Sequence, residues 1–259
     1  MLFTNMATGA TPRKLNLGCG PRFVRDPSWE NTDFSHLQAS VRRVDLRRPL
    51  PYGPDTFDLV YTSHVLDHFP LGRVDALLGE LHRCLRPGGV LRISVPDLEY
   101  NARIYLASAK ENRGDPVRHR WHTIQLLDQM TRTAPGGQKL EFLKMAQGRP
   151  EVQQWVRPLL NYELLQLLDR RDPPPTLAQR LKKLIKELLG GQSYDKLGDR
   201  HFWTFDAISL PEMLRSRGFS RVEIAAWNRS LSAAFLSDNL DAQDGAEYKP
   251  GSLYVEGIK

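Results

Sequence analysis

The sequence contains few cysteines and no long apolar segment. Only Cys19 and Cys84 are cysteines among 259 residues. This is too few for a disulfide framework, so we expect a reducing, cytoplasmic compartment. No apolar run approaches the roughly 20 residues that a membrane-spanning helix needs, so we expect no transmembrane segment. Residues 1–14 lack a basic segment followed by an apolar core, which argues against a signal peptide.

Positive charge is concentrated in one part of the chain. The net charge is +6, and residues 101–200 contain 18 Lys and Arg against 11 Asp and Glu, whereas the remainder contains 18 against 19. This basic segment either attracts an anionic partner or only solvates the outer faces of packed helices. No recognised RNA- or DNA-binding module accompanies the charge, which argues against nucleic acid as a partner.

Short apolar stretches alternate with amphipathic ones near both ends of the chain. The predicted strands are residues 14–17, 29–34, 57–62, 90–95, 221–226 and 253–258. Residues 74–85 place five apolar side chains on one helical face, and Arg86–Gly89 carry residues typical of a helix end. A second helix is predicted over residues 210–217. Strand–helix–strand spacing of this kind indicates an α/β fold with a parallel sheet.

The middle of the chain has a different character. Residues 101–199 are rich in Leu, Gln, Lys and Arg and contain no convincing strand. Residues 176–189 form the clearest amphipathic basic pattern of this segment. We therefore predict a helical insertion or cap at 101–199 and an α/β domain made of residues 1–100 and 200–259. The acidic segment 238–247 is expected to be a solvated loop.

A glycine-rich turn, Gly18-Cys19-Gly20, follows the first predicted strand. A dinucleotide-binding turn requires a third glycine where Phe23 stands, and a phosphate-binding P-loop requires a Gly-Lys-Ser/Thr sequence that is absent. These absences argue against a nicotinamide-dependent oxidoreductase. Taken alone, the turn is also compatible with an ordinary strand-to-helix connection.

Four blocks in order make the pattern more specific. LNLGCGP, DLRRPLPYGPDTFDLVYTSHVLDH, LHRCLRPGGVLRISVPD and HFWTFDAISLPEMLRSRGFSRVEIAAW together resemble the class I S-adenosylmethionine-dependent methyltransferases, in particular the methyltransferase type 11 group. The resemblance covers about residues 13–100 and 200–259. It implies a Rossmann-like doubly wound sheet of about seven strands, with S-adenosylmethionine as the cofactor and S-adenosylhomocysteine as the product.

The resemblance also implies a cofactor site at the carboxyl ends of several strands. Its residues would be Gly18, Cys19, Gly20, Asp33, Asp45, Leu46 and Ser63. The glycine turn would approach the methionine and ribose part, and Asp33 would accept both ribose hydroxyls. Asp45 and Leu46 would contact the adenine, and Ser63 would line the floor beneath the sulfonium together with His64.

Two positions depart from the family pattern. Asn16 stands where an acidic residue is frequent, and Arg22 stands where another glycine is frequent. Only 12 residues separate Gly20 from Asp33, so the helix that usually follows the glycine turn must be shortened or replaced by a loop.

The candidate catalytic residues are His64, His68 and Asp97. His64 directly follows the predicted strand at 57–62 and is the first choice for a base that removes a proton from the methyl acceptor. His68 is favoured as a packing residue, and helix capping competes with catalysis for Asp97. Cys19 is expected to be a packed thiol.

Three polar residues in or beside the insertion are weaker candidates. A structural role is favoured for His122, Asp128 and His201, and no metal-binding signature is present.

From these observations we predict a methyltransferase that acts on a small molecule or glycan, with oxygen favoured as acceptor atom over nitrogen or carbon. An anionic acceptor would suit the basic insertion. The alternatives are a non-catalytic protein that uses the same fold as a binding scaffold, and another nucleotide-dependent enzyme such as an oxidoreductase.

Overall fold

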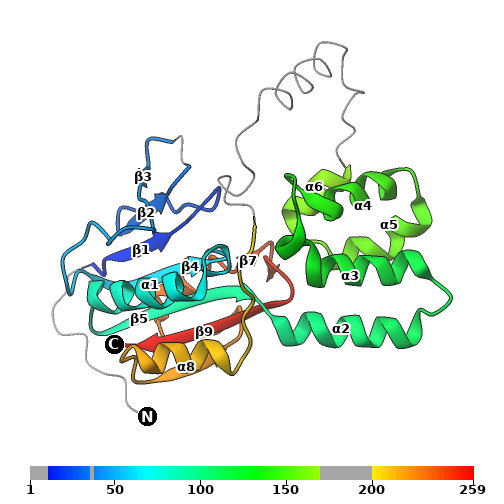
Figure 1. The fold of residues 1–259 in the computed structure, drawn as a ribbon. Coiled ribbons are helices and arrows are strands. Elements are labelled where there is room, and N and C mark those ends of the chain that lie inside the picture. Colours follow the sequence, from blue (N-terminus) through cyan, green and yellow to red (C-terminus); the bar gives the residue numbers. More distant parts are fainter. Residues whose placement is uncertain (1–10, 36–37, 170–199) are drawn as a thin grey trace, which may run out of the picture. The chain divides into compact units, whose positions relative to one another are not determined.

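The structure is a computed structural model that describes residues 11–35, 38–169 and 200–259. The chain divides into two compact units (Figure 1). The first consists of Met1–Pro96, Phe205–Glu247 and Leu253–Lys259, and the second of Asp97–Thr204 and Tyr248–Ser252. Among the residues so described, no helix is both long enough and apolar enough to cross a membrane.

The first unit is built on a seven-stranded sheet with the order β3-β2-β1-β4-β5-β9-β6. The strands are β1 (Lys14–Leu17), β2 (Trp29–Asp33), β3 (Val41–Arg43), β4 (Phe57–Ser63), β5 (Leu85–Pro96), β6 (Val222–Ala225) and β9 (Ser252–Ile258). Strands β1 to β5 pair in parallel, and β6 runs antiparallel to β9. The strand order reverses between β1 and β4, the arrangement of a doubly wound sheet. The predicted fold class is confirmed.

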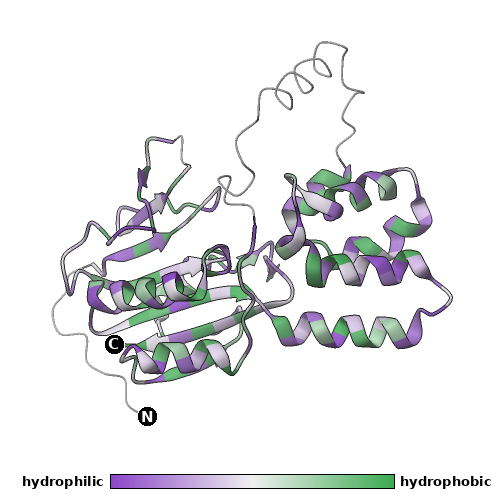
Figure 2. Cartoon of the chain, viewed as in Figure 1, coloured by the Kyte–Doolittle hydropathy of each residue, from purple (hydrophilic) through white to green (hydrophobic). Residues whose placement is uncertain are grey.

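One face of this sheet packs against α1 (Leu71–Cys84) and α8 (Ser209–Ser216). The apolar stripe of α1 is fully buried, as its spacing predicts: Val74, Leu77, Leu78 and Leu81 are all 0% exposed. Burial of each such side chain stabilises the fold by about 1.5–3 kcal/mol. Figure 2 shows the corresponding alternation of apolar and polar residues along this helix.

The start of β5 differs from the sequence prediction. Helix α1 ends at Cys84, and Arg86–Gly89 belong to β5 instead of forming the end of the helix. Gly89 is tightly packed at this point, because a Cβ there would lie 2.9 Å from the carbonyl oxygen of Arg86.

The opposite face of the sheet is covered by the chain between β6 and β9. This covering segment, residues 226–247, contains α9 (Ala233–Leu236) and the hairpin of β7 (Ala242–Gln243) and β8 (Ala246–Glu247). Phe235 and Leu240 pack here against Trp29, Leu59 and Tyr61.

Arg92 of β5 fastens the covering segment to the sheet. Its guanidinium is fully buried and donates from Nε to Asp241 Oδ2 over 2.6 Å and from Nη1 to Glu256 Oε1 over 2.8 Å. Tyr61 of β4 donates its hydroxyl to the other oxygen of Asp241. The prediction of a solvated acidic loop at 238–247 is therefore wrong: Asp241 is 3% exposed, because Arg92 and Tyr61 bind its carboxylate inside the unit.

The second unit is helical in the part that the structure describes. Its helices are α2 (Leu98–Glu111), α3 (Pro116–Thr131), α4 (Gly137–Gln147), α5 (Pro150–Val156) and α6 (Tyr162–Asp169), with the 3₁₀ turn η2 (Arg157–Leu159). Trp121, Phe142 and Val156 are at the centre of its apolar core. The helix predicted over residues 176–189 lies outside the described residues.

Candidate functional site

The loops that follow β1, β2 and β4 meet at one edge of the sheet. Because these strands are parallel neighbours, their carboxyl ends lie side by side, and the strand order reverses between β1 and β4. Ligands of open α/β sheets generally bind beside such a reversal. Most of the predicted site residues lie in these loops or are the last residue of the strand before them. Asp45 and Leu46, which follow β3, are also held beside the end of β2, since Val44 donates its N–H to the carbonyl of Asp33 over 3.0 Å.

The glycine turn is bonded to the end of β2. Gly20 donates its N–H to Asp33 Oδ2 over 2.9 Å, and Cys19 donates its N–H to the carbonyl of Thr32. The other carboxylate oxygen of Asp33 accepts the N–H of Ser35 over 2.9 Å. A carboxylate has about four lone-pair directions. Asp33 can therefore orient the turn and still accept hydroxyl donors.

The two glycines of the turn have different surroundings. Both have a positive φ, +67° at Gly18 and +51° at Gly20. A Cβ at Gly18 would lie 2.5 Å from Cγ2 of Val65, whereas a Cβ at Gly20 would have no atom within 4 Å. The absence of a side chain at Gly18 therefore lets β1 pack against the loop after β4. At Gly20 it leaves open space beside the Asp33 carboxylate.

Cys19 lies between these glycines as a buried side chain, 7% exposed. Burial, together with the nearby charge of Asp33, raises the pKa of its thiol to about 12. A thiol in this environment stays protonated at neutral pH and is a poor nucleophile.

A tight turn at residues 45–48 follows β3. Arg73 of α1 donates from Nε to the carbonyl of Leu46 over 2.9 Å and from Nη2 to that of Arg48. Asp45 accepts both N–H groups of the Arg47 guanidinium fork, and this contact lowers the pKa of Asp45 to about 2. The Leu46 side chain is buried in the core.

Ser63 ends β4, and His64 is the first residue after it. His64 donates its N–H to the carbonyl of Ser94 over 2.8 Å and has a φ of +53°, in the left-handed region that residues other than glycine rarely adopt. The adjoining Val65 contacts Gly18 closely, so the His64 loop lies against the glycine turn. Strained backbone of this kind is concentrated at functional sites in proteins.

His68 and Asp97 occupy structural positions. His68 ends the 3₁₀ turn η1 (Leu66–His68), and its Nε2 lies 3.6 Å from the fully buried carboxylate of Asp67. Asp97 follows β5 and belongs to the helical unit. Its Oδ1 accepts the N–H groups of Glu99 and Tyr100, which caps α2.

The weaker candidates of the insertion also make structural contacts. Asp128 accepts the N–H of Gln138 and a guanidinium N–H of Arg132, each over 2.6 Å. His201 donates its backbone N–H to the carbonyl of Gln129. His122 is partly buried, and this burial lowers the pKa of its imidazole.

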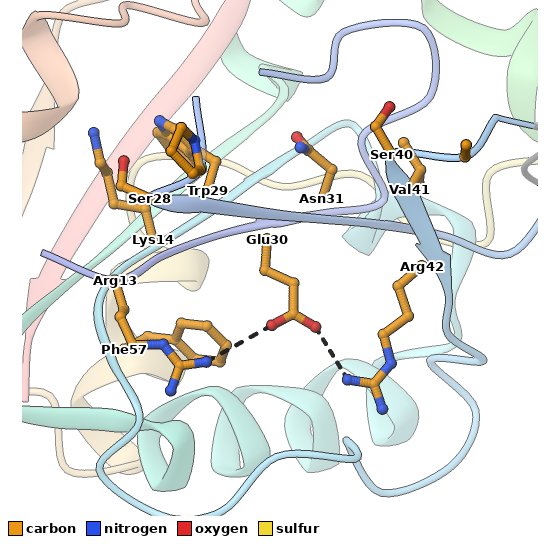
Figure 3. A pocket seen from close by; sticks show the side chains of 12 residues that line it. Arg13, Lys14, Ser28, Trp29, Glu30, Asn31, Ser40, Val41, Arg42 and Phe57 are labelled. Carbon is orange, nitrogen blue, oxygen red and sulfur yellow. Dashed lines mark hydrogen bonds and ion pairs between the residues drawn. The ribbon is translucent and has the colours of Figure 1, made fainter. Parts of the chain in front are cut away.

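A cavity of about 420 Å³ lies at the opposite edge of the sheet, where β1 to β4 begin (Figure 3). Glu30 points into it between Arg13 and Arg42 and accepts a hydrogen bond from the hydroxyl of Tyr52 over 2.7 Å. Because the glycine turn is at the other end of β1, this cavity is separate from the predicted cofactor site.

Sequence reasoning did not identify the contacts that hold the glycine turn in place. Asn16 donates its side-chain amide to the carbonyl of Arg22, and the Arg22 guanidinium donates to residues 242 and 243 of β7. The signal in the sequence was the unusual residue type at these two positions.

Comparisons with known proteins point to one family. A family model described as "Methyltransferase domain" matches residues 15–93, from β1 into β5. A comparison with curated proteins gave no significant match.

Solved structures with a similar fold include two methyltransferases. One is an S-adenosylmethionine-dependent methyltransferase from Mesorhizobium loti, 16% identical over 96% of this chain and 91% of that one, with a TM-score of 0.40. The other is a SAM-dependent methyltransferase from Archaeoglobus fulgidus, 12% identical over 96% and 86% of the two chains, with a TM-score of 0.40.

Proposed function

We propose that this chain, a class I S-adenosylmethionine-dependent methyltransferase with S-adenosylmethionine as its cofactor, methylates an oxygen atom of a small molecule or glycan. The observation that carries the proposal is the position of His64, a titratable side chain on strained backbone whose loop packs against the glycine turn. We further infer a cytoplasmic location, because both cysteines are buried free thiols.

The glycine turn and Asp33 offer space and hydrogen-bond acceptors for the ribose of the cofactor. The open space at Gly20 lies beside a carboxylate that already accepts one N–H on each oxygen. We assign ribose binding to Asp33, close backbone approach to Gly18–Gly20, adenine contact to Asp45 and Leu46, and the floor of the site to Ser63. For Asp45 to bind adenine, its pair with Arg47 must open or rearrange.

When bound, S-adenosylmethionine supplies a methyl group on a sulfonium that needs no further activation. The chain's own contribution is positioning of the acceptor and removal of its proton. A hydroxyl acceptor must lose a proton as it reacts, and we assign this proton to the His64 imidazole. The basic segment at residues 101–200 supports an acceptor that carries negative charge.

The cofactor and the acceptor class are tested separately. S-Adenosylhomocysteine at about 100 times its dissociation constant should stabilise the protein by roughly 2.7 kcal/mol in thermal melting, whereas NAD should leave the melting temperature unchanged. A panel of hydroxylated, phosphorylated and amine acceptors with a ¹³C-methyl donor then identifies the methylated atom by NMR. Turnover of amines alone would contradict the oxygen assignment.

His64→Asn tests the proposed base. Asparagine tolerates a positive φ, so the backbone of β4's end should be retained. Loss of the base should lower kcat/KM by about 10²–10⁴-fold. His68→Asn is the matched control and should stay near wild type. Equal losses in the two variants would contradict the assignment.

A further inference from the structure

The glycine turn continues into a loop without regular structure. Residues 20–28 contain no helix. Gly18 and Gly20 both have a positive φ. Glycine has the largest conformational freedom of any residue, and ordering one residue of backbone costs roughly 1–2 kcal/mol. A turn of this kind binds a ligand well only if other contacts already hold its conformation.

Two buried asparagines hold the loop from the sheet side. Asn16 of β1 donates from Nδ2 to the carbonyl of Arg22 over 2.8 Å and to Asn31 Oδ1 over 3.2 Å. Asn31 of β2 accepts the N–H of Val24 over 2.9 Å and donates to the carbonyl of Val24 over 2.7 Å. The two side chains are 1% and 4% exposed. An aspartate at position 16 would lack the N–H groups that make the first two contacts.

The Arg22 side chain holds the same loop from the other side. Its Nη2 donates to the carbonyl of Ala242 over 2.8 Å and its Nη1 to Gln243 Oε1 over 3.1 Å. Asp241, the residue before this strand, is bound by Arg92 and Tyr61 in the sheet. Hydrogen bonds thus connect the glycine turn through β7 to the two central strands of the unit.

We propose that Asn16 and Arg22 are positioning residues of the cofactor site, which hold the glycine turn in its binding conformation before the cofactor arrives. The two departures from the family pattern then act together, since the amide of one binds the carbonyl of the other. The inference rests on the assignment of Gly18–Gly20 and Asp33 to the cofactor in the proposed function.

Arg22→Ala tests the inference, with Arg25→Ala as a matched control. Arg25 lies in the same loop and is exposed, and within the described residues it makes a cation–π contact with Phe23. We expect the dissociation constant for S-adenosylhomocysteine, measured by calorimetry, to rise about tenfold in Arg22→Ala, the equivalent of one lost charge-assisted hydrogen bond. Arg25→Ala should stay within about twofold of wild type. Arg22→Lys, which keeps one donor for β7, should be intermediate.

A measurement without ligand separates positioning from general stability. Hydrogen exchange of the amides at residues 18–24 should be faster in Arg22→Ala than in wild type, while exchange in α1 should be unchanged. A lower melting temperature with unchanged affinity and unchanged local exchange would overturn the inference, as would an equal loss of affinity in Arg25→Ala. If the wild-type protein itself does not bind S-adenosylhomocysteine, the cofactor assignment fails, and the positioning role fails with it.

Discussion

At the scale of single residues, the glycine turn shows that two identical residues in one motif serve different purposes. Gly18 is required by the protein, because any Cβ there would meet Val65. Gly20 faces open space beside Asp33, the space that the proposed function assigns to the cofactor. The same residue type is thus needed for packing at one position, and at the other it leaves room that a ligand could use.

Alanine substitutions should separate the two purposes. Gly18→Ala combines a strained φ with a steric clash and should lower the free energy of unfolding by about 2–4 kcal/mol. Gly20→Ala should lower it by about 1–2 kcal/mol, from backbone strain alone, but should strongly weaken S-adenosylhomocysteine binding. Urea unfolding and calorimetry measure the two effects.

Val65→Ala provides the control for the clash. In that background the steric part of the Gly18→Ala effect should disappear and mainly the backbone part should remain, so the two substitutions should be non-additive. Additive effects would show that Val65 does not restrict position 18.

At the scale of elements, two arginines of β5 form ion pairs in different surroundings. Arg92 is 0% exposed and binds two carboxylates that are themselves buried. Arg86 pairs with Asp58 near the surface, with 42% of its side chain exposed. Removing one partner of a buried pair leaves an uncompensated charge, whereas an exposed pair contributes little.

Replacement of each arginine by methionine should reveal this difference. Arg92→Met should lower the free energy of unfolding by about 3–5 kcal/mol, because Asp241 and Glu256 would remain buried without their cation. Arg86→Met should lower it by at most about 1 kcal/mol. Chemical denaturation of both variants measures the effect, and similar values would contradict the role of Arg92 in fastening the covering segment.

At the scale of the whole molecule, the surplus positive charge lies in residues 101–200 of the sequence, whereas the residues proposed for the cofactor lie between positions 18 and 63. Charge of this kind attracts an anionic partner over a distance that shortens as salt is added, from a Debye length of about 10 Å at 0.1 M to about 3 Å at 1 M.

The dependence of KM on salt tests this separation. For an anionic acceptor KM should rise severalfold between 0.05 and 0.5 M salt (about 13 to 4 Å of Debye length), whereas for a neutral acceptor it should change little. The affinity for S-adenosylhomocysteine serves as the internal reference and should vary less. A KM that is independent of salt would mean that the basic side chains only solvate the helical unit.

The extent to which the sequence predicts the fold depends on the range of the contacts involved. The apolar spacing of α1 and the strand at residues 57–62 report burial directly, and both were recognised. Strand β3 was not predicted, because its three residues Val41–Arg43 include two arginines and its pairing with β2 alone makes it a strand. The roles of the individual site residues remain predictions that binding and activity must test.

The sequence by itself determined the α/β pattern, the glycine turn and the short connection to Asp33, since all of these are local in the chain. Only the tertiary structure decided that Asp241 is buried and that Asn16 and Arg22 bond across the loop. It also showed that Gly18 is needed because of Val65. The physical reason is that a buried charge or a close approach depends on its partner, and the sequence does not say which residue that partner is: Asn16 and Arg22 are six positions apart, whereas Arg92 and Asp241 are separated by 149.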